Sequence, residues 1–267
     1  MLTSHAYLLP SVPTMLIDEQ RGDVTEMIEA LSASGERLAA EKPDAIVALS
    51  PRWVSPGPFA VDDSRQLRSV IDLPGFGVEP RYDCAGDPAL ARLLVEQVNK
   101  TGVRATVSRR GIDSSAAIPL HFFARARWAP VVPVSIGEGT REEHRAWGAA
   151  LRHALTAWEG KAAFVVGGAL SWSVHDFNLR REVPDGLDLD QRVLSILRRG
   201  DWSELEDAVE TAGKRAAPEA QLLHLEVLRG FLMLEHVPGD VLEYETSPGI
   251  STVLVEYPLH GAENAGD

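Results

Sequence analysis

The chain has 267 residues, 45% of them hydrophobic, which is enough for one large α/β domain with a sizeable core. Its 26 Lys and Arg residues stand against 39 Asp and Glu residues, and the formal net charge of -13 argues against nucleic acid or an anionic membrane as a partner. The single cysteine, Cys84, excludes a disulfide framework and a Cys-rich metal site. Because the sequence has neither a signal-peptide pattern nor a long apolar run, we expect a cytoplasmic protein.

Short apolar runs and helical patterns alternate along most of the chain. The apolar runs predict strands at residues 6–9, 45–49, 103–107, 130–136, 162–166 and 252–257. Helical spacing predicts helices at residues 23–40, 88–99, 140–158, 187–199, 202–211 and 218–234. Asp87 and Thr140 have the residue types and spacing of helix N-caps. We therefore expect a single α/β domain over residues 1–260, with a central, mainly parallel or mixed sheet flanked by helices, and a tail at 261–267.

Two polar segments directly follow predicted strands, namely residues 50–53 and 167–172. In open α/β sheets, ligands bind beyond the carboxyl ends of the strands. The sequence therefore predicts that both segments line one pocket.

These two segments and a third one carry a family pattern. They read Ser50-Pro51-Arg52-Trp53, Asp113-Ser114-Ser115-Ala116-Ala117-Ile118-Pro119-Leu120 and Gly167-Gly168-Ala169-Leu170-Ser171-Trp172. They resemble the patterns S-P-H, L-D-H-G-x-x-x-P-L and S-G-x-L-S-H of the class III extradiol ring-cleavage dioxygenases, the LigB-type family. Further similar landmarks at residues 87–91, 130–135 and 198–202 extend the resemblance over nearly the whole chain.

The resemblance implies a site for ferrous iron, which this family holds with two histidines and one carboxylate, leaving positions open for a catecholate and O2. His5 matches the first histidine ligand. Glu219 is the nearest match to the carboxylate, with Glu226 as an alternative. The second histidine position holds Arg52, and a guanidinium cannot donate a lone pair to a metal ion.

Two further histidines of the family act around the substrate, and their positions here hold Ser114 and Trp172. Neither a serine hydroxyl nor an indole can replace an imidazole as a proton shuttle near neutral pH. His175, three residues after Trp172, could restore an imidazole, although it also fits a polar loop. Three of the four matched histidine positions are thus replaced, which indicates changed or abandoned catalysis.

Each of these residues also has an ordinary structural interpretation. His5 could be a hydrogen-bonded histidine at a strand end, and His224 could lie on a mixed-charge surface of its helix. Arg52 could bind a carboxylate or phosphate, occupy the place of the metal opposite Glu219, or form an ordinary ion pair. With Trp53 and Asp113, Arg52 makes up the expected substrate-binding group.

Three functional hypotheses follow. In the first, the chain is a subunit or homologue of an extradiol dioxygenase whose own iron site is degenerate, and it forms a homo-oligomer or a heteromer with a related catalytic chain. In the second, it is an active metal-dependent oxygenase with a rebuilt site that uses His5, Glu219 and either His175 or His224. In the third, it binds small aromatic acids through Arg52 and Trp53.

Overall fold

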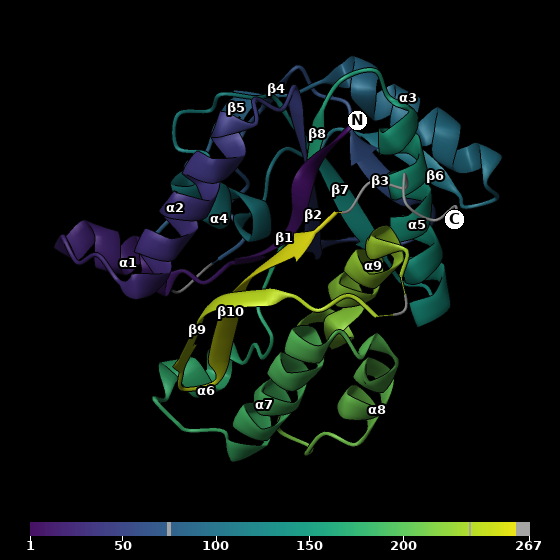
Figure 1. Ribbon diagram of the computed structural model, residues 1–267. Helices are drawn as coiled ribbons and strands as arrows, with labels where there is room; N and C mark the ends of the chain where they lie inside the picture. Colours follow the sequence, from purple (N-terminus) through teal and green to yellow (C-terminus); the bar gives the residue numbers. More distant parts are fainter. Residues whose placement is uncertain (74–75, 235, 260–267) are drawn as a thin grey trace.

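The computed structural model describes residues 1–73, 76–234 and 236–259, in which strands and helices alternate along most of the chain (Figure 1). The strands are β1 (Leu2–Pro10), β2 (Ala45–Ser55), β3 (Phe59–Asp62), β4 (Gln66–Leu67), β5 (Cys84–Ala85), β6 (Ala105–Ser108), β7 (Val131–Gly137), β8 (Ala162–Gly168), β9 (Asp240–Ser247) and β10 (Ile250–Pro258). The α-helices are α1 (Thr14–Arg21), α2 (Glu26–Ala40), α3 (Pro88–Lys100), α4 (Ser114–Phe123), α5 (Arg141–Ala157), α6 (Val174–Asn178), α7 (Pro184–Arg199), α8 (Leu205–Glu210) and α9 (Leu223–Leu232). Two 3-10 turns are η1 (Trp202–Glu204) and η2 (Glu219–Leu222). The expected tail at 261–267 lies outside the described residues.

Within the described residues, eight strands form one sheet in the order β6-β3-β7-β2-β8-β1-β10-β9. The central strands β7, β2, β8 and β1 are parallel, and β10 and β9 continue the sheet in antiparallel pairings. Strands β7 and β8 are buried along their whole length, as expected for parallel strands that are covered on both faces. The sheet is therefore mixed with a parallel centre, which confirms the predicted fold class.

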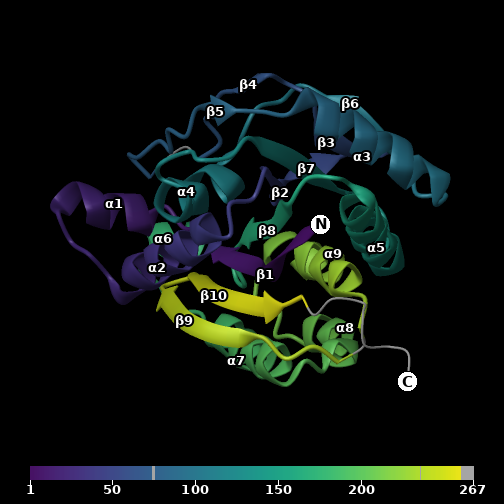
Figure 2. The same ribbon diagram turned by 45° about the horizontal axis from the view of Figure 1, so that its top comes forward.

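Successive side chains of the central strands enter two separate cores, because strand side chains alternate between the faces of a sheet. Ala6 and Leu8 pack in a core that also contains side chains of α3, α5, α7 and α9. Tyr7 and Leu9 pack in a second core with side chains of α1, α2 and α4. Figure 2 shows these two groups of helices on opposite sides of the sheet.

The predicted helix starts at Asp87 and Thr140 are confirmed. The Asp87 carboxylate accepts hydrogen bonds from the backbone N–H groups of Ala89 and Leu90, and Thr140 forms a complete capping box with Glu143. Asp113 caps α4 in the same way, so Ser114 becomes the first residue of that helix. This cap fixes the position of Ser114 at the edge of the sheet.

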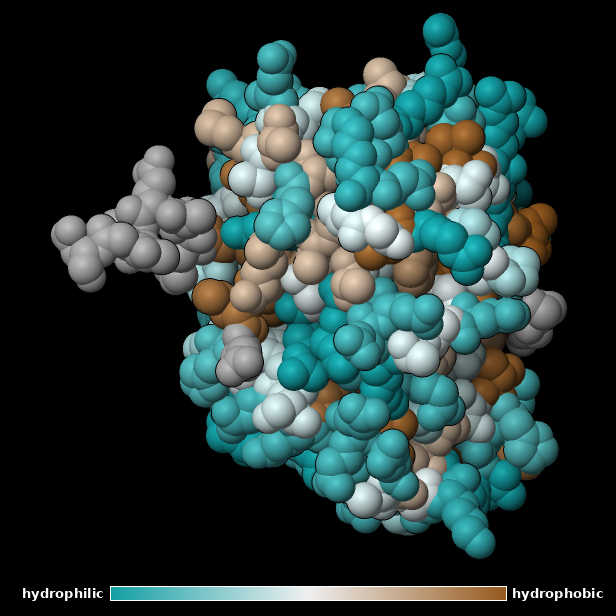
Figure 3. Space-filling view, turned by 90° about the vertical axis from the view of Figure 1, so that its right-hand side faces the viewer, coloured by the Kyte–Doolittle hydropathy of each residue, from teal (hydrophilic) through white to brown (hydrophobic). Residues whose placement is uncertain are grey.

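Some elements differ from the sequence prediction. Strands β3, β4, β5 and β9 and helices α1, α4 and α6 were not predicted. The helix predicted over 218–234 is divided into η2 and α9, because Ala220 and Gln221 within η2 have φ angles of 47° and 54°. None of the described helices is long and apolar enough to span a bilayer. Hydrophilic residues cover much of the face in Figure 3, with apolar residues scattered among them.

Candidate functional site

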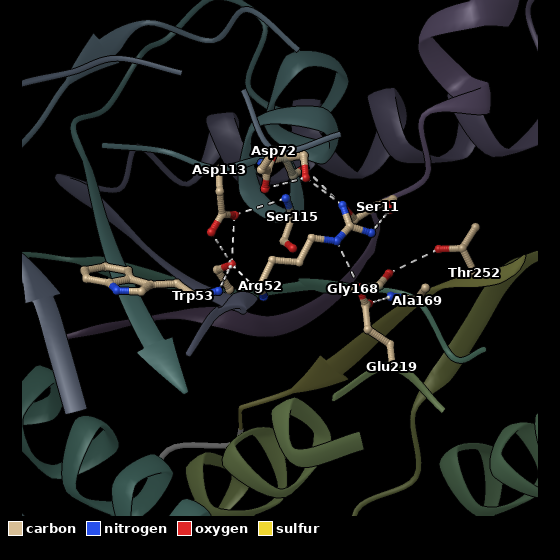
Figure 4. Close-up of polar contacts among 12 residues, drawn as sticks. Ser11, Arg52, Trp53, Asp72, Asp113, Ser115, Gly168, Ala169, Glu219 and Thr252 are labelled. Atoms are coloured by element: carbon tan, nitrogen blue, oxygen red, sulfur yellow. Dashed lines mark hydrogen bonds and ion pairs between the residues drawn. The ribbon is translucent and has the colours of Figure 1, made fainter. Parts of the chain in front are cut away.

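The two polar segments predicted to share a pocket do meet at the carboxyl ends of the parallel strands. Strand β1 brings Ser11 to this edge, β2 brings Arg52, and the residues after β8 bring Trp172. Helix α4 contributes Ser114 at its N-terminus, and η2 contributes Glu219. Figure 4 shows the Arg52 guanidinium between Ser11 and Glu219.

Arg52 contacts residues from several of these elements. Its Nε donates a hydrogen bond to Oε1 of Glu219 at 3.0 Å, and its Nη1 donates to Oγ of Ser114 at 2.7 Å. Its Nη2 donates to the main-chain oxygen of Ser11 at 3.1 Å. The guanidinium also stacks on Trp172, with Cζ 4.0 Å from the ring centroid. A forked, planar cation suits this arrangement because it donates in several fixed directions.

Ser114 extends the network to a second carboxylate. Its hydroxyl donates to Oδ2 of Asp72 at 3.0 Å, and its backbone N–H also donates to the Asp72 carboxylate. Asp72 therefore accepts hydrogen bonds at the N-terminus of α4, where a negative charge is favourable. The two carboxylates, Asp72 and Glu219, thus flank the position of the guanidinium.

Beneath this network, Ser50 and Asp113 form a buried pair. The Ser50 hydroxyl lies 2.7 Å from Oδ2 and 2.8 Å from Oδ1 of Asp113 and accepts hydrogen bonds from the backbone N–H groups of Arg52 and Trp53. Burial raises the pKa of Asp113, while its hydrogen bond from Ser50 opposes the shift. Asp113 thus fixes the chain around Arg52 and caps α4, and it does not point into an open pocket.

Glu219 is held from two sides. Its Oε2 accepts a hydrogen bond from the backbone N–H of Ala169, while Oε1 is occupied by Arg52. Burial raises the pKa of Glu219, and the Arg52 guanidinium and the Ala169 N–H oppose this shift. The turn that carries Glu219 is strained, because Ala220, Gln221 and Leu222 all have positive φ.

His224 is fully buried, so the surface interpretation of this residue is wrong. Within the described part of the chain, neither of its ring nitrogens has a hydrogen-bond partner. A Cβ placed on Gly168 would come within 2.9 Å of His224 Nε2 and 3.3 Å of Glu219 Oε2, so the histidine lies close beneath the site. Burial, and secondarily the Arg52 charge, lowers the pKa of His224 to about 3, so its ring is neutral.

The structure does not bring His5 to this group. His5 pairs with Pro258 near the start of β1, whereas Pro10 at the other end of β1 pairs with Gly168 beside the site. Ser11 lies six residue steps after His5, which in an extended strand separates their Cα atoms by about 20 Å. His5 and Glu219 therefore cannot share one metal ion, and the residue at the end of β1 that reaches the site is Ser11. Sequence reasoning missed Ser11 because a serine gives no sign of a metal or acid/base site, although its place directly after β1, like that of residues 50–53 near the end of β2, could have indicated it.

The other predicted residues have different surroundings. Trp53 is buried and points away from the Arg52 guanidinium, so the two do not form a joint binding group (Figure 4). His175 is exposed on α6 and does not line the pocket beside Trp172. The alternative carboxylate, Glu226, is buried in ion pairs with Arg141 and Arg145.

A pocket of about 410 Å³ opens beside Arg52. This volume suits a small organic molecule. Larger hollows lie elsewhere, next to α1, α2 and β3, whereas this one lies against Arg52 and Glu219. Its wall combines apolar side chains with two carboxylates: Val54, Leu73, Phe76 and Trp172, with Asp72 and Glu219.

The side chains at the site do not fit a ferrous ion. Ser11, Arg52 and Ser114 supply no imidazole, and the cationic guanidinium donates to Glu219 at 3.0 Å, where a metal ion would need this carboxylate as a ligand. Across the described residues, no group of three or more His, Cys, Asp and Glu side chains is arranged to hold a metal ion. The arrangement is that of an internal ion pair with hydrogen-bonded serines around it.

Comparisons with known proteins agree with the fold and the sequence patterns. The family model described as the catalytic LigB subunit of aromatic ring-opening dioxygenase matches residues 5–255. The 2-aminophenol 1,6-dioxygenase alpha subunit of Pseudomonas sp is 28% identical over 95% of this chain and 98% of that protein. The 3,4-dihydroxyphenylacetate 2,3-dioxygenase of Escherichia coli is 21% identical over 78% of this chain and 80% of that enzyme.

A solved structure has the same fold. It is the crystal structure of an uncharacterized protein from Escherichia coli K12, with a TM-score of 0.73 and 19% identity, covering 95% of this chain and 99% of that one. The family match spans nearly all of the chain, from the first strand to the last. The chain therefore belongs to the LigB family of aromatic ring-opening dioxygenase subunits.

Proposed function

We propose that this chain is a companion subunit of an aromatic ring-opening dioxygenase and does not itself cleave the ring. In this proposal it associates with a related chain that carries the complete Fe(II) site, in the cytoplasm, and its domain covers residues 1–260. The observation that carries the proposal is the set of contacts around Arg52. The Arg52 guanidinium, which donates hydrogen bonds to Glu219, Ser114 and Ser11, occupies the site at which the family's chemistry is expected.

The absence of acid/base groups at two positions supports the same role. Ser114 donates to Asp72, and the Trp172 ring is covered by the guanidinium, so neither residue presents a basic nitrogen to the pocket. The relative from Pseudomonas sp is named as an alpha subunit, which is in keeping with a multi-chain enzyme. The same relative suggests 2-aminophenol or a similar small aromatic compound as the substrate of the assembled enzyme.

The other two hypotheses receive less support from the geometry. The rebuilt metal site would need His5, together with His175 or His224, beside Glu219, and of these three histidines only His224 lies close to it. An aromatic acid would have to compete with Glu219 for Arg52 and would face a second carboxylate, Asp72, in the pocket wall. Both hypotheses therefore require the hydrogen bonds of Arg52 to Glu219, Ser114 and Ser11 to break.

The proposal is tested by assembly and activity together. The chain is purified alone and after co-expression with a LigB-type chain of the same genome that keeps all the family histidines. We expect a stable heteromer by size-exclusion chromatography with light scattering, and ring cleavage of catechol or 2-aminophenol, supplied with Fe(II), only in the heteromer. Ring cleavage by the purified chain alone would overturn the proposal.

A further inference from the structure

The Arg52 guanidinium lies in a nearly enclosed space between strands and helices that are far apart in sequence. The Arg52 side chain is 12% exposed, and its ion-pair partner Glu219 is 5% exposed. Ser11, Ser114 and Glu219 contact the guanidinium from β1, α4 and η2, respectively. Such a buried cation requires both charge compensation and hydrogen-bond acceptors, and these residues supply both.

Both oxygens of Glu219 are already engaged. Oε1 accepts from Arg52 and Oε2 accepts from the Ala169 N–H. A divalent ion that bound Glu219 would have to displace one of these donors and would lie next to a permanently charged guanidinium. Like charges at such short range in a poorly solvated site repel strongly.

We propose that Arg52 is the resident cation of this site: its guanidinium permanently neutralises Glu219, joins β1, β2, α4 and η2, and excludes divalent metal ions from the site. The inference rests on the proposed function and extends it. A cation that belongs to the chain itself would let the companion subunit keep the family fold without iron. Its test needs only the isolated chain.

The fork of the side chain matters as well as its charge. Nε, Nη1 and Nη2 reach three different acceptors, which a lysine ammonium at the end of a flexible chain would not reach together. The Trp172 ring also stacks on the planar face of the guanidinium. Arg52→Lys is therefore expected to keep the charge and still lose part of the stability.

The experiment is a double-mutant cycle on the full chain, made of wild type, Arg52→Met, Glu219→Gln and the double variant, with thermal unfolding as readout. Arg52→Met leaves the Glu219 carboxylate buried without its partner, and we expect the melting temperature to fall by on the order of 10 °C. Arg52→Met combined with Glu219→Gln removes both charges and is expected to recover at least about half of this loss. Arg92→Met is the matched control, because Arg92 pairs with Asp63 while its side chain is 63% exposed, and it should cost less than about 3 °C.

The same samples are titrated with Co²⁺, which reports a protein site by its visible absorbance. For the wild-type chain we expect no Co²⁺ absorbance band and no Co²⁺-dependent rise in melting temperature. One Co²⁺ bound per wild-type chain and lost in Glu219→Gln would overturn the inference, as would a double variant that melts no higher than Arg52→Met. These outcomes do not depend on the assembly test, in which the lack of an active heteromer would overturn the companion role and leave the inference about Arg52 standing.

Discussion

The main-chain oxygen of Ser11 accepts a hydrogen bond from Nη2 of Arg52 at 3.1 Å, although the two residues are 41 positions apart. This contact joins the carboxyl ends of β1 and β2, which are separated in the sheet by β8. Glu219 lies on the other side of the same guanidinium. Positions 11, 52 and 219 therefore converge on one point.

This convergence predicts that a metal site can be created at these positions. Two imidazoles and one carboxylate form a common ligand set for divalent first-row metals. We expect Ser11→His with Arg52→His to bind about one Co²⁺ per chain, with a visible absorbance band and a higher melting temperature in its presence. Arg52→His alone should bind much more weakly, and adding Glu219→Gln to the double variant should abolish binding. A double variant that binds Co²⁺ no better than wild type would contradict the convergence of these positions.

The Ser50–Asp113 pair gives a second prediction. Ser50→Ala removes the donor to a buried carboxylate and the acceptor for the N–H groups of Arg52 and Trp53. We expect a loss of about 2 kcal/mol in the free energy of unfolding, measured by urea denaturation. Ser203→Ala, at an exposed position, is the control and should stay within about 0.5 kcal/mol of wild type. A loss for Ser50→Ala as small as the control would mean that Asp113 finds other partners.

The sequence was sufficient to predict the parallel centre of the sheet, because continuous apolar runs are typical of strands that are buried on both faces. It was not sufficient for β9, an edge strand with Glu243 and Glu245 whose side chains are half exposed. The short β3 was missed for a different reason, because its four residues pair mainly with the distant β6. Pairing between strands that are far apart in the chain depends on tertiary structure, so the local sequence pattern of a short strand does not reveal it.

The candidate site was predicted in part. The positions of Arg52, Ser114 and Trp172 follow from strand ends and motif spacing, and the structure brings them together. The left-handed turn at Ala220–Leu222 could not be predicted, because these residues do not favour positive φ and adopt it only under tertiary constraint. The sequence pattern shows no such turn, and the prediction therefore placed Glu219 in a continuous helix and His224 on the surface of that helix.

His224 provides a prediction about pH. Its pKa in the folded protein is lowered to about 3, whereas an unfolded histidine titrates near 6.5, so between these values the unfolded chain binds the extra proton. Stability is therefore lost as the pH falls through this window, and His224 alone accounts for about 2 kcal/mol between pH 7 and pH 5.

Urea denaturation at pH 7 and pH 5 measures this effect. In His224→Leu the pH-dependent loss should be smaller than in wild type by about 2 kcal/mol, because leucine does not titrate. His153→Gln, at an exposed position of α5, should keep the wild-type dependence. Equal pH dependence in wild type and His224→Leu would show that the ring acquires a proton in the folded state.

Asp190 on α7 predicts a pH effect of the opposite sign. It is fully buried, and its Oδ2 accepts hydrogen bonds from Ser171 and Tyr244, while Oδ1 has no partner among the described residues. Burial raises its pKa to about 6, against about 3.9 in an unfolded chain. The folded protein thus keeps a proton that the unfolded chain releases, and stability is lost as the pH rises from about 4 through 6.

Asp190→Asn isolates this contribution, because asparagine is neutral at every pH. The new amide has a fixed cost of its own, so the quantity to follow is the difference in unfolding free energy between the variant and wild type. Between pH 4 and pH 7, we expect the unfolding free energy of the variant to rise relative to that of wild type by on the order of 2–3 kcal/mol. Urea denaturation at steps of half a pH unit measures this change. Asp207→Asn, on the exposed side of α8, should show a flat difference. A flat difference for Asp190→Asn as well would mean that its carboxyl is ionised in the folded protein throughout this range, stabilised by its three hydroxyl neighbours, Ser171, Tyr244 and Ser251.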